Sequence, residues 1–180
     1  MDNIGGAIKT SANIFLIGFM GSGKTHWGKI WAVNNKCSFI DLDEVIEKTA
    51  GETVAEIFEK KGEDHFRQLE TTALKNCAVL TNTIIACGGG TPCYYDNMQW
   101  MNEQGTTIYI TCTAAGILKR VALEQEKRPL FRKLNKAELL FFIEQKLKER
   151  EPFYRMAKIT VASHLLTPTS LPALLSTGSI

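Results

Sequence analysis

The sequence predicts an α/β fold in which a doubly wound, five-stranded parallel sheet is flanked by helices. Two observations support this prediction. Short apolar runs typical of buried strands alternate with helical patterns along the whole chain, which favours parallel strands joined by helical crossovers. A glycine-rich run from Gly18 to Thr25 follows the first of these strands directly and opens a helix, as a strand–loop–helix unit requires.

The length of 180 residues fits one domain, and 44% apolar with 22% charged residues is typical of a globular protein with a sizeable core. We expect a single domain over residues 13–180. Residues 1–12 are small, polar and aperiodic, which predicts a flexible leader. The 21 Lys and Arg against 19 Asp and Glu leave a net charge of only +2. This balance predicts no nucleic-acid partner and no membrane partner, so any anion must be bound by a local site.

Five runs are predicted as strands because each is short and mostly apolar, as strands covered on both faces should be. They are Asn13–Ile17, Ser38–Asp41, Thr83–Cys87, Thr106–Thr111 and Ile159–Ala162.

The helices are marked by capping residues and by apolar faces. Thr53 and Glu56 form a capping box that opens a short helix. A longer helix follows, and another begins near Asn135. The inward faces predicted for these two helices consist of Phe66, Leu69, Ala73, Leu74 and Cys77 in the first, and Leu139, Leu140, Ile143 and Leu147 in the second.

The five cysteines are odd in number, form no C-x-x-C pair and lie mostly in apolar stretches. This pattern predicts buried free thiols rather than a zinc site or a disulfide framework. The N-terminus has no signal-peptide pattern, and the chain has no run of about 18 consecutive apolar residues. These features predict a cytoplasmic protein.

The most specific motif is the P-loop G-x-x-x-x-G-K-[ST], which binds phosphate and here spans Gly18 to Thr25. Its glycines permit torsions that turn successive N–H groups toward the anion, and the following helix presents its positive end to the same anion. Lys24 adds a cation, and Thr25 adds a hydroxyl ligand for Mg²⁺. The next residue, His26, has two interpretations, a contact to phosphate or a plain surface position.

Two carboxylates follow the second predicted strand. Asp41 and Asp43 lie two residues apart at its carboxyl end, so the period of a strand places both on one side, at the sheet edge where ligands bind. One carboxylate can orient a metal-bound water and the other a substrate hydroxyl. The alternative is structural, with Asp43 as the N-cap of a helix that starts near Glu44.

Three consecutive glycines, Gly88, Gly89 and Gly90, follow the third predicted strand. Such glycines are unfavourable unless a ligand or another backbone comes close, so a second phosphate or polar-substrate contact is one interpretation. The other interpretation is that they let the chain turn sharply into a helix that starts at Cys93.

Two arginines also have a functional and a structural interpretation. Arg67 lies beside an apolar helix face with Glu70 one turn on, a spacing that is usual for a surface ion pair. Arg150 is predicted to end its helix beside a proline and two aromatic residues, where the helix dipole favours any cation. A guanidinium binds a carboxylate with two hydrogen bonds and stays charged, so the two arginines suit an acceptor that carries a carboxylate.

Residues 124–136 have the weakest periodicity of the chain and crowd charged side chains around Pro129. We expect this segment to be mobile.

In combination, these motifs resemble those of shikimate kinases. Six pieces occur in the order and approximate spacing of that family, over nearly all of residues 13–170. The resemblance implies an adenylate-kinase-like fold with a lid at residues 124–136. It also implies transfer of the γ-phosphoryl group of ATP to the 3-hydroxyl of shikimate, on the route to chorismate and the aromatic amino acids. The six pieces are Gly18 to Thr25, Asp41-x-Asp43, Phe66-Arg67-x-x-Glu70, Gly88-Gly89-Gly90, Arg128-Pro129-Leu130 and Arg150-x-Pro152-x-Tyr154.

The resemblance implies a role for each matched position. The ATP site would comprise Gly21, Ser22, Gly23, Lys24, Thr25, His26 and Arg128. The shikimate site would comprise Asp43, Arg67, Gly88, Gly89, Gly90 and Arg150. The catalytic residues would be Lys24, Asp43 and Arg128, and Mg²⁺ would be held by Thr25 and, through water, by Asp41. An adenine loop is expected around Leu166 to Pro168, whereas His26 and Trp27 are bulkier than the residues usual at their positions in the family.

The chemistry of phosphoryl transfer agrees with these roles. The reaction needs charge neutralisation on three equatorial oxygens and an oriented hydroxyl group. Mg²⁺, Lys24 and Arg128 can supply the first of these, and Asp43 the second.

Two other function classes share the P-loop. A small-molecule kinase acting on gluconate also has a P-loop and a lid, but it does not need Arg67 and Arg150 together with Asp43. A GTPase-like or noncatalytic switch needs an N-K-x-D motif after a late strand, whereas the run at residues 35–38 lacks the Asp and precedes a strand. The predicted partners are therefore ATP and shikimate, and the protein is predicted to be a monomer.

Overall fold

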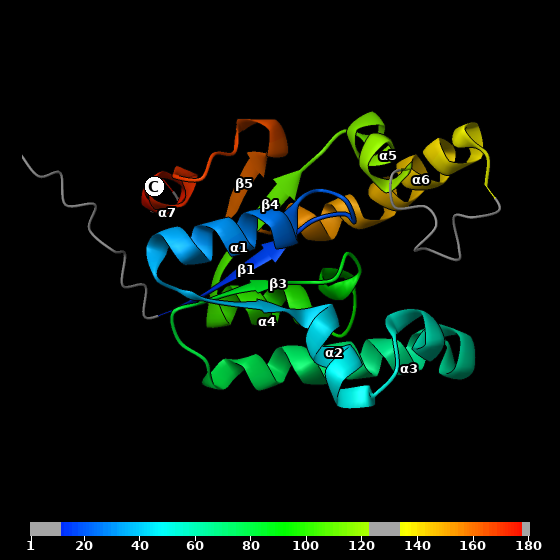
Figure 1. The fold of residues 1–180 in the computed structure, drawn as a ribbon, viewed down its shortest axis with the longest axis horizontal. Coiled ribbons are helices and arrows are strands. Elements are labelled where there is room, and N and C mark those ends of the chain that lie inside the picture. Colours follow the sequence, from blue (N-terminus) through cyan, green and yellow to red (C-terminus); the bar gives the residue numbers. More distant parts are fainter. Residues whose placement is uncertain (1–11, 123–133, 178–180) are drawn as a thin grey trace, which may run out of the picture.

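The computed structural model describes residues 12–122 and 134–177 of the chain. Within these ranges five parallel strands form one sheet in the order β2-β3-β1-β4-β5, with β1 in the centre (Figure 1). The predicted five-stranded parallel sheet is confirmed, and every strand boundary agrees within one residue. The strands are β1 (Asn13–Ile17), β2 (Ser38–Asp41), β3 (Thr83–Ala86), β4 (Gly105–Thr111) and β5 (Ile159–Ala162).

Helices cover both faces of the sheet, which makes the fold doubly wound as predicted (Figure 1). They are α1 (Lys24–Asn35), α2 (Leu42–Ala50), α3 (Val54–Asn76), α4 (Asn97–Gln104), α5 (Ala114–Ala122), α6 (Lys136–Tyr154) and α7 (Ser170–Thr177). Short 3-10 helices are η1 (Cys77–Val79), η2 (Thr91–Cys93) and η5 (Ser163–Leu165). None of the helices in the two described ranges is long and apolar enough to cross a membrane.

The central strand β1 explains why the core has two halves. Ile14 and Leu16 point to the face covered by α1 and α7, where they pack with Trp31. Phe15 and Ile17 point to the opposite face, which α2 to α6 cover. Because both faces are buried, a central strand of a parallel sheet is a continuous apolar run rather than an alternating one.

Helix α3 joins two predicted helices into one element. The capping box of Thr53 and Glu56 opens it as predicted, and Phe66 and Leu74 on the predicted inward face are buried. The helix is kinked at Gly62, whose torsions of φ 81° and ψ 173° lie outside the helical region and are accessible mainly to glycine. The predicted short and long helices are therefore two arms of α3 on either side of this kink.

Helices α4 and α6 each differ from the prediction at one end. The helix expected to start at Cys93 begins at Asn97, because η2 comes first and then Tyr95 and Asp96 take positive φ values of 46° and 57°. Helix α6 begins after Asn135 as predicted, but it continues past Arg150 to Tyr154, with Pro152 inside its last turns. Tyr154 is fully buried, so packing holds these turns in place.

All five cysteines are free, as predicted, with Cys77 and Cys87 buried and the other three partly buried. Most of the predicted leader and most of the predicted lid, including Arg128, lie outside the described residues.

Candidate active site

The segments predicted to bind ligands meet at the carboxyl edge of the sheet. The P-loop follows β1, Asp41 is the last residue of β2, and the Gly88–Gly90 loop comes shortly after β3. In an open parallel sheet this edge is where ligands bind, and the point where the strand order reverses lies next to β1. The fold thus places three motifs from separate parts of the sequence side by side.

The P-loop connects β1 to α1 and requires glycine at two positions. Gly23 is the N-cap of α1 with φ 105°, in the left-handed region that strains other residues. A Cβ atom at Gly18 would lie 2.6 Å from the carbonyl oxygen of Ile110 on β4. The hydroxyl of Ser22 is buried and has no hydrogen-bond partner among the described residues. A buried polar group without a partner is consistent with a loop that binds a polar ligand.

Lys24 is the first residue of α1, and its side chain folds back over the loop. Its Nζ donates hydrogen bonds to the carbonyl oxygens of Gly18 at 2.8 Å and Phe19 at 3.0 Å. The residue is only 9% exposed. The ammonium group therefore lies at the mouth of the P-loop, where a cation can contact phosphate oxygens.

Asp41 and Thr25 form a direct contact, although they are 16 residues apart. The Thr25 hydroxyl donates to Asp41 Oδ2 at 2.7 Å. The other oxygen of Asp41, Oδ1, accepts a hydrogen bond from the backbone N–H of Asp43 at 3.1 Å and so caps α2. The capping role considered for Asp43 therefore belongs to Asp41, because α2 starts at Leu42 rather than near Glu44.

Asp43 itself lies in the first turn of α2, so the strand period does not determine its direction, contrary to the prediction. The pKa of its carboxyl is raised from 3.8 to about 6, most by burial and further by the negative charges of Asp41 and Glu70, while Lys24 opposes the shift. A Cβ atom at Gly88 would lie 3.2 Å from Asp43 Oδ1. Asp43 thus lies beside the glycine-rich loop, partly buried and close to other carboxylates.

The three glycines after β3 make room for side chains of α3. A Cβ atom at Gly88 would lie 2.5 Å from Glu70 Oε1, and one at Gly90 would lie 2.5 Å from the Nη1 atom of Arg67. Gly90 has an ordinary φ of −94°, so the requirement there is for space and not for torsion. Other groups of the chain approach all three glycines, since Glu70 lies at Gly88, Arg150 at Gly89 and Arg67 at Gly90. These close neighbours are mainly charged side chains, whereas the sequence predicted a ligand or another backbone.

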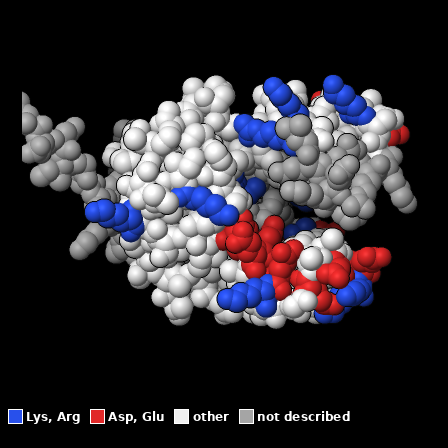
Figure 2. Space-filling model, viewed as in Figure 1, with Lys and Arg blue, Asp and Glu red and all other residues white. Residues whose placement is uncertain are grey.

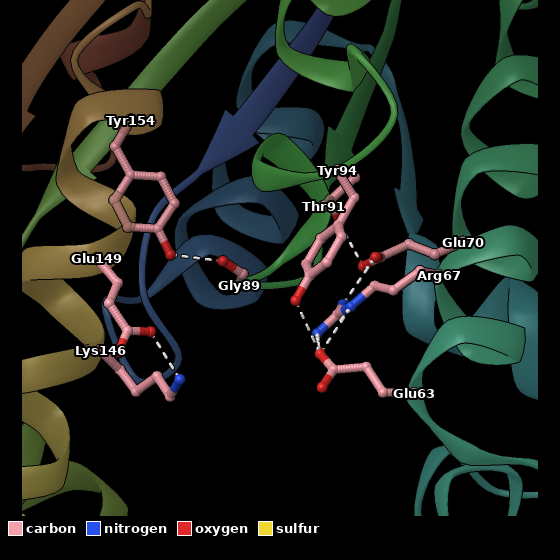
Figure 3. Close-up of polar contacts among 9 residues, drawn as sticks. All are labelled: Glu63, Arg67, Glu70, Gly89, Thr91, Tyr94, Lys146, Glu149 and Tyr154. Atoms are coloured by element: carbon pink, nitrogen blue, oxygen red, sulfur yellow. Dashed lines mark hydrogen bonds and ion pairs between the residues drawn. The ribbon is translucent and has the colours of Figure 1, made fainter.

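Arg67 is held in a buried ion-pair network (Figure 3). Its Nη1 donates to Glu70 Oε2 at 2.8 Å, and its Nη2 donates to Glu63 Oε1 at 2.9 Å. The side chains of Arg67 and Glu70 are 7% and 0% exposed, so the interpretation of this pair as a surface ion pair is wrong. The second carboxylate oxygen of Glu70 accepts a hydrogen bond from Thr91. Burial of both charges makes the pair sensitive to loss of either partner.

Arg150 reaches the same loop from α6. Its guanidinium carbon lies 5.5 Å from the ring centre of Phe19 in the P-loop, and its Nη1 lies 3.3 Å from the position of a Cβ atom at Gly89. The Tyr154 hydroxyl, also on α6, donates to the Gly89 carbonyl oxygen (Figure 3). These contacts bring Arg150 between the P-loop and the glycine-rich loop, so it does not simply neutralise a helix end.

Arg120 was not predicted and lies next to the P-loop. Its Nη1 donates to the carbonyl oxygens of Gly21 at 2.8 Å and Ser22 at 3.1 Å. It belongs to α5, which follows β4, and only that position after a strand end could have singled it out in the sequence.

The other predicted nucleotide contacts lie on α1 and near it. His26 is exposed, and its ring meets that of Trp27 edge-on at 5.0 Å between centroids. The loop expected to contact adenine is tied to α1, because Trp31 Nε1 donates to the Thr167 carbonyl oxygen at 2.9 Å. In the same loop the Pro168 carbonyl oxygen accepts a hydrogen bond from Asn34.

A metal site is compatible with the residues that meet here. The Thr25 hydroxyl and the Asp41 carboxylate are hard oxygen donors, which Mg²⁺ prefers. The described parts of the chain contain no group of three or more His, Cys, Asp or Glu that could hold a metal ion by themselves. This sparse donor set fits Mg²⁺, which keeps several waters and shares its remaining positions with substrate phosphates.

Comparison with known proteins gives a consistent result. The family described as shikimate kinase matches residues 20–173. The shikimate kinase of Phocaeicola vulgatus is 42% identical over 145 residues, which are 81% of this chain and 83% of the relative.

Two solved structures agree closely with the fold. The shikimate kinase of Bacteroides thetaiotaomicron has a TM-score of 0.83 and 37% identity, covering 93% of this chain and 94% of that one. The shikimate kinase of Acinetobacter baumannii in complex with shikimate has a TM-score of 0.83 and 31% identity, covering 95% and 94%. A gluconokinase from Sinorhizobium meliloti, at 14% identity and a TM-score of 0.57, shares the fold alone. The predicted adenylate-kinase-like architecture is confirmed.

Proposed function

Since this chain belongs to the shikimate kinase family, we propose that it transfers the γ-phosphoryl group of ATP to the 3-hydroxyl of shikimate. The products are shikimate 3-phosphate and ADP, on the route to chorismate and the aromatic amino acids. One observation carries the proposal beyond family membership. Asp43, Arg67 and Arg150 come from three different helices and meet around the Gly88–Gly90 loop, next to the P-loop.

The two arginines bind the acceptor's carboxylate in this proposal. Arg67 and Arg150 both lie against the glycine-rich loop, at Gly90 and Gly89 respectively. A guanidinium presents its donors in a planar fork that matches a carboxylate, and it stays charged when buried. The backbone of Gly89 offers a further polar contact to the same molecule.

Asp43 orients the acceptor's hydroxyl group. With a pKa of about 6, its carboxyl is mostly ionised at neutral pH and able to accept a proton as the phosphoryl group is transferred. Because the transition state of phosphoryl transfer is loose, orientation of the hydroxyl matters as much as removal of its proton.

Lys24 and the P-loop backbone hold the transferred phosphoryl group. The ammonium lies over the loop, where it stabilises charge on the β- and γ-phosphates. Arg128 is proposed to act with it from the lid; it lies outside the described residues.

Thr25 and Asp41 would hold Mg²⁺, the first through its hydroxyl and the second through a water molecule. Mg²⁺ held there would supply positive charge that offsets the negative charge of the phosphates. Asp41 also connects the proposed metal site to Asp43, because its other oxygen accepts the Asp43 backbone N–H and caps the helix on which Asp43 lies.

The deciding experiment measures ADP release with ATP, Mg²⁺ and one of several acceptors offered in parallel. Shikimate should support turnover, whereas gluconate and nucleoside monophosphates should not. Turnover with gluconate and none with shikimate would instead assign the protein to the rival class that shares the fold.

We also propose that the protein acts as a cytoplasmic monomer. Five free thiols support a reducing compartment. Light scattering with and without shikimate tests the oligomeric state.

A further inference from the structure

One carboxylate oxygen on α3 collects three hydrogen bonds. Glu63 Oε1 accepts from Arg67 Nη2 at 2.9 Å, from Arg67 Nε at 3.2 Å and from the Tyr94 hydroxyl at 3.0 Å (Figure 3). The Nε and Nη2 edge of a guanidinium is one that binds carboxylates with two parallel bonds. Glu63 therefore occupies, with its own carboxylate, an edge of Arg67 that an acceptor carboxylate would use.

The two carboxylates around Arg67 differ in how firmly they are held. Glu70 is fully buried and bound through both oxygens, by Arg67 and by Thr91. The side chain of Glu63 is 51% exposed, and Glu63 directly follows the kink of α3 at Gly62. A Cβ atom at Gly62 would meet nothing within 4 Å, so the backbone there has open space around it. Glu63 can therefore move away from Arg67 into solvent, whereas moving Glu70 would leave a buried charge without its partner.

The charge balance around Arg67 also indicates that either Glu63 or Glu70 must move away before an anionic acceptor can bind there. Arg67 carries one positive charge and is paired with two negative ones, so an anionic acceptor meets no net attraction there while both remain. Acidic side chains gather over α2 and α3, and several of them pair with lysines there, so this surface adds no net attraction for anions (Figure 2). Hydrogen bonds from Arg67 lower the pKa of the Glu63 carboxyl most, and the positive charge of Arg150 also lowers it. Glu63 thus lies within electrostatic reach of both arginines.

We propose that Glu63 stands in for the carboxylate of the acceptor on Arg67 and is displaced when the acceptor binds. The inference rests on the proposed function, in which Arg67 and Arg150 bind that carboxylate. Glu63 is then a specificity-determining residue. An acceptor that carries a carboxylate breaks the ion pair between Glu63 and Arg67 and forms a new one with Arg67. A neutral polyol cannot form such a pair, so Glu63 stays bound to Arg67 and the polyol gains no binding energy there.

The test is Glu63→Gln, which keeps the size of the side chain and removes its charge. The Kd of shikimate, measured by titration calorimetry without ATP, and the KM for shikimate should both fall about 5-fold, the ratio expected when one half-exposed ion pair no longer competes. The KM for ATP should stay unchanged. Glu59→Gln is the matched control, because it removes the same charge from an exposed position on the other side of the kink in α3.

Tyr94→Phe gives a second, milder test. It removes one donor to Glu63 and leaves the aromatic ring, whose centre is 4.5 Å from the Arg67 guanidinium carbon. The Kd of shikimate should fall by a smaller factor than in Glu63→Gln.

The sign of the change decides between displacement and its alternative. If Glu63 only orients Arg67, both variants weaken shikimate binding, and a rise in Kd overturns the proposal. An unchanged Kd in a folded Glu63→Gln variant also overturns it. If the parent enzyme does not phosphorylate shikimate at all, the proposed function fails first and the displacement model fails with it. A parent that turns over shikimate, with variants that bind it no better, overturns the displacement model alone.

Discussion

The nucleotide half and the acceptor half of the site are built in opposite ways. The P-loop half consists of consecutive residues, Gly18 to Thr25, whose function resides mainly in backbone torsions and in one lysine. The acceptor half consists of side chains from three helices and one loop, which no short stretch of sequence contains. The two halves meet along β1 and β3, which are neighbours in the sheet.

The cations of the two halves also have different surroundings. Lys24 Nζ donates hydrogen bonds to the carbonyl oxygens of Gly18 and Phe19, and its charge also acts on Asp43, where it opposes the rise in pKa that burial causes. Arg67 instead donates to two carboxylates, and Asp43 close by has a raised pKa because burial and further carboxylates surround it. The phosphate-binding loop is thus organised mainly by backbone geometry, whereas the acceptor site is organised by the balance of buried charges. Changes in the first half should therefore act mainly on catalysis, whereas changes in the second should also alter acceptor binding, pH dependence and stability.

The largest effect is expected for Lys24→Ala. Turnover should fall about 100-fold or more, because a cation that contacts developing charge on the phosphoryl group is lost. The fold should survive, which circular dichroism and Tm will check. Lys29→Ala on the same helix is the control, since Lys29 is exposed and pairs with Glu44 at 3.6 Å. A Lys24→Ala variant with near-parental kcat would remove the P-loop from the mechanism.

Asp43→Asn should lower kcat about 100-fold, with a much smaller change in the KM for ATP, because the amide can still hydrogen-bond the hydroxyl but cannot accept its proton. Asp41→Asn should instead shift the Mg²⁺ dependence of the rate. Steady-state kinetics at varied Mg²⁺ separates the two roles. If Asp43→Asn changes only thermal stability, the acceptor hydroxyl must be oriented by another group.

Arg67→Lys and Arg150→Lys should each raise the KM for shikimate about 10-fold, because an ammonium keeps the charge and loses the planar fork. The KM for ATP should hardly change. Arg155→Lys is a matched control at the end of α6, where Arg155 forms an exposed pair with Glu151. Unchanged values for shikimate in both variants would assign these arginines to structure rather than to binding.

The smallest effect is a pH-dependent gain in stability. The pKa of Asp43 is about 6 in the folded state against 3.8 in the unfolded state, so the parent loses stability as the pH rises through this interval. Asp43→Asn does not titrate and should be more stable than the parent at neutral pH, by a few degrees in Tm. The difference should fade as the pH falls from about 6 toward 4. Tm values of both proteins across this range check the sign, and a parent that is more stable at neutral pH contradicts it.

Most of the architecture could be predicted from the sequence because local patterns carry it. The strands are apolar runs, and the capping box at Thr53 and the cap at Asn135 mark helix starts through their own side-chain hydrogen bonds. The errors come from packing. Arg150 does not end α6, because the burial of Tyr154 and its hydrogen bond to Gly89 hold the helix beyond Pro152. Asp41 rather than Asp43 caps α2, because the helix starts directly at the end of β2.

The sequence by itself determined the P-loop, because consecutive residues there dictate both the torsions and the chemistry. It also indicated Arg67 and Glu70 as a pair, since they lie one helical turn apart. Only the tertiary structure decided that this pair is buried and that the absence of a Cβ atom at Gly88 and Gly90 leaves space for it. The same holds for Glu63 and Tyr94, which complete the surroundings of the pair. The physical reason is that burial and charge balance depend on which elements pack together, and Glu63 and Tyr94, 31 residues apart, meet only in the folded chain.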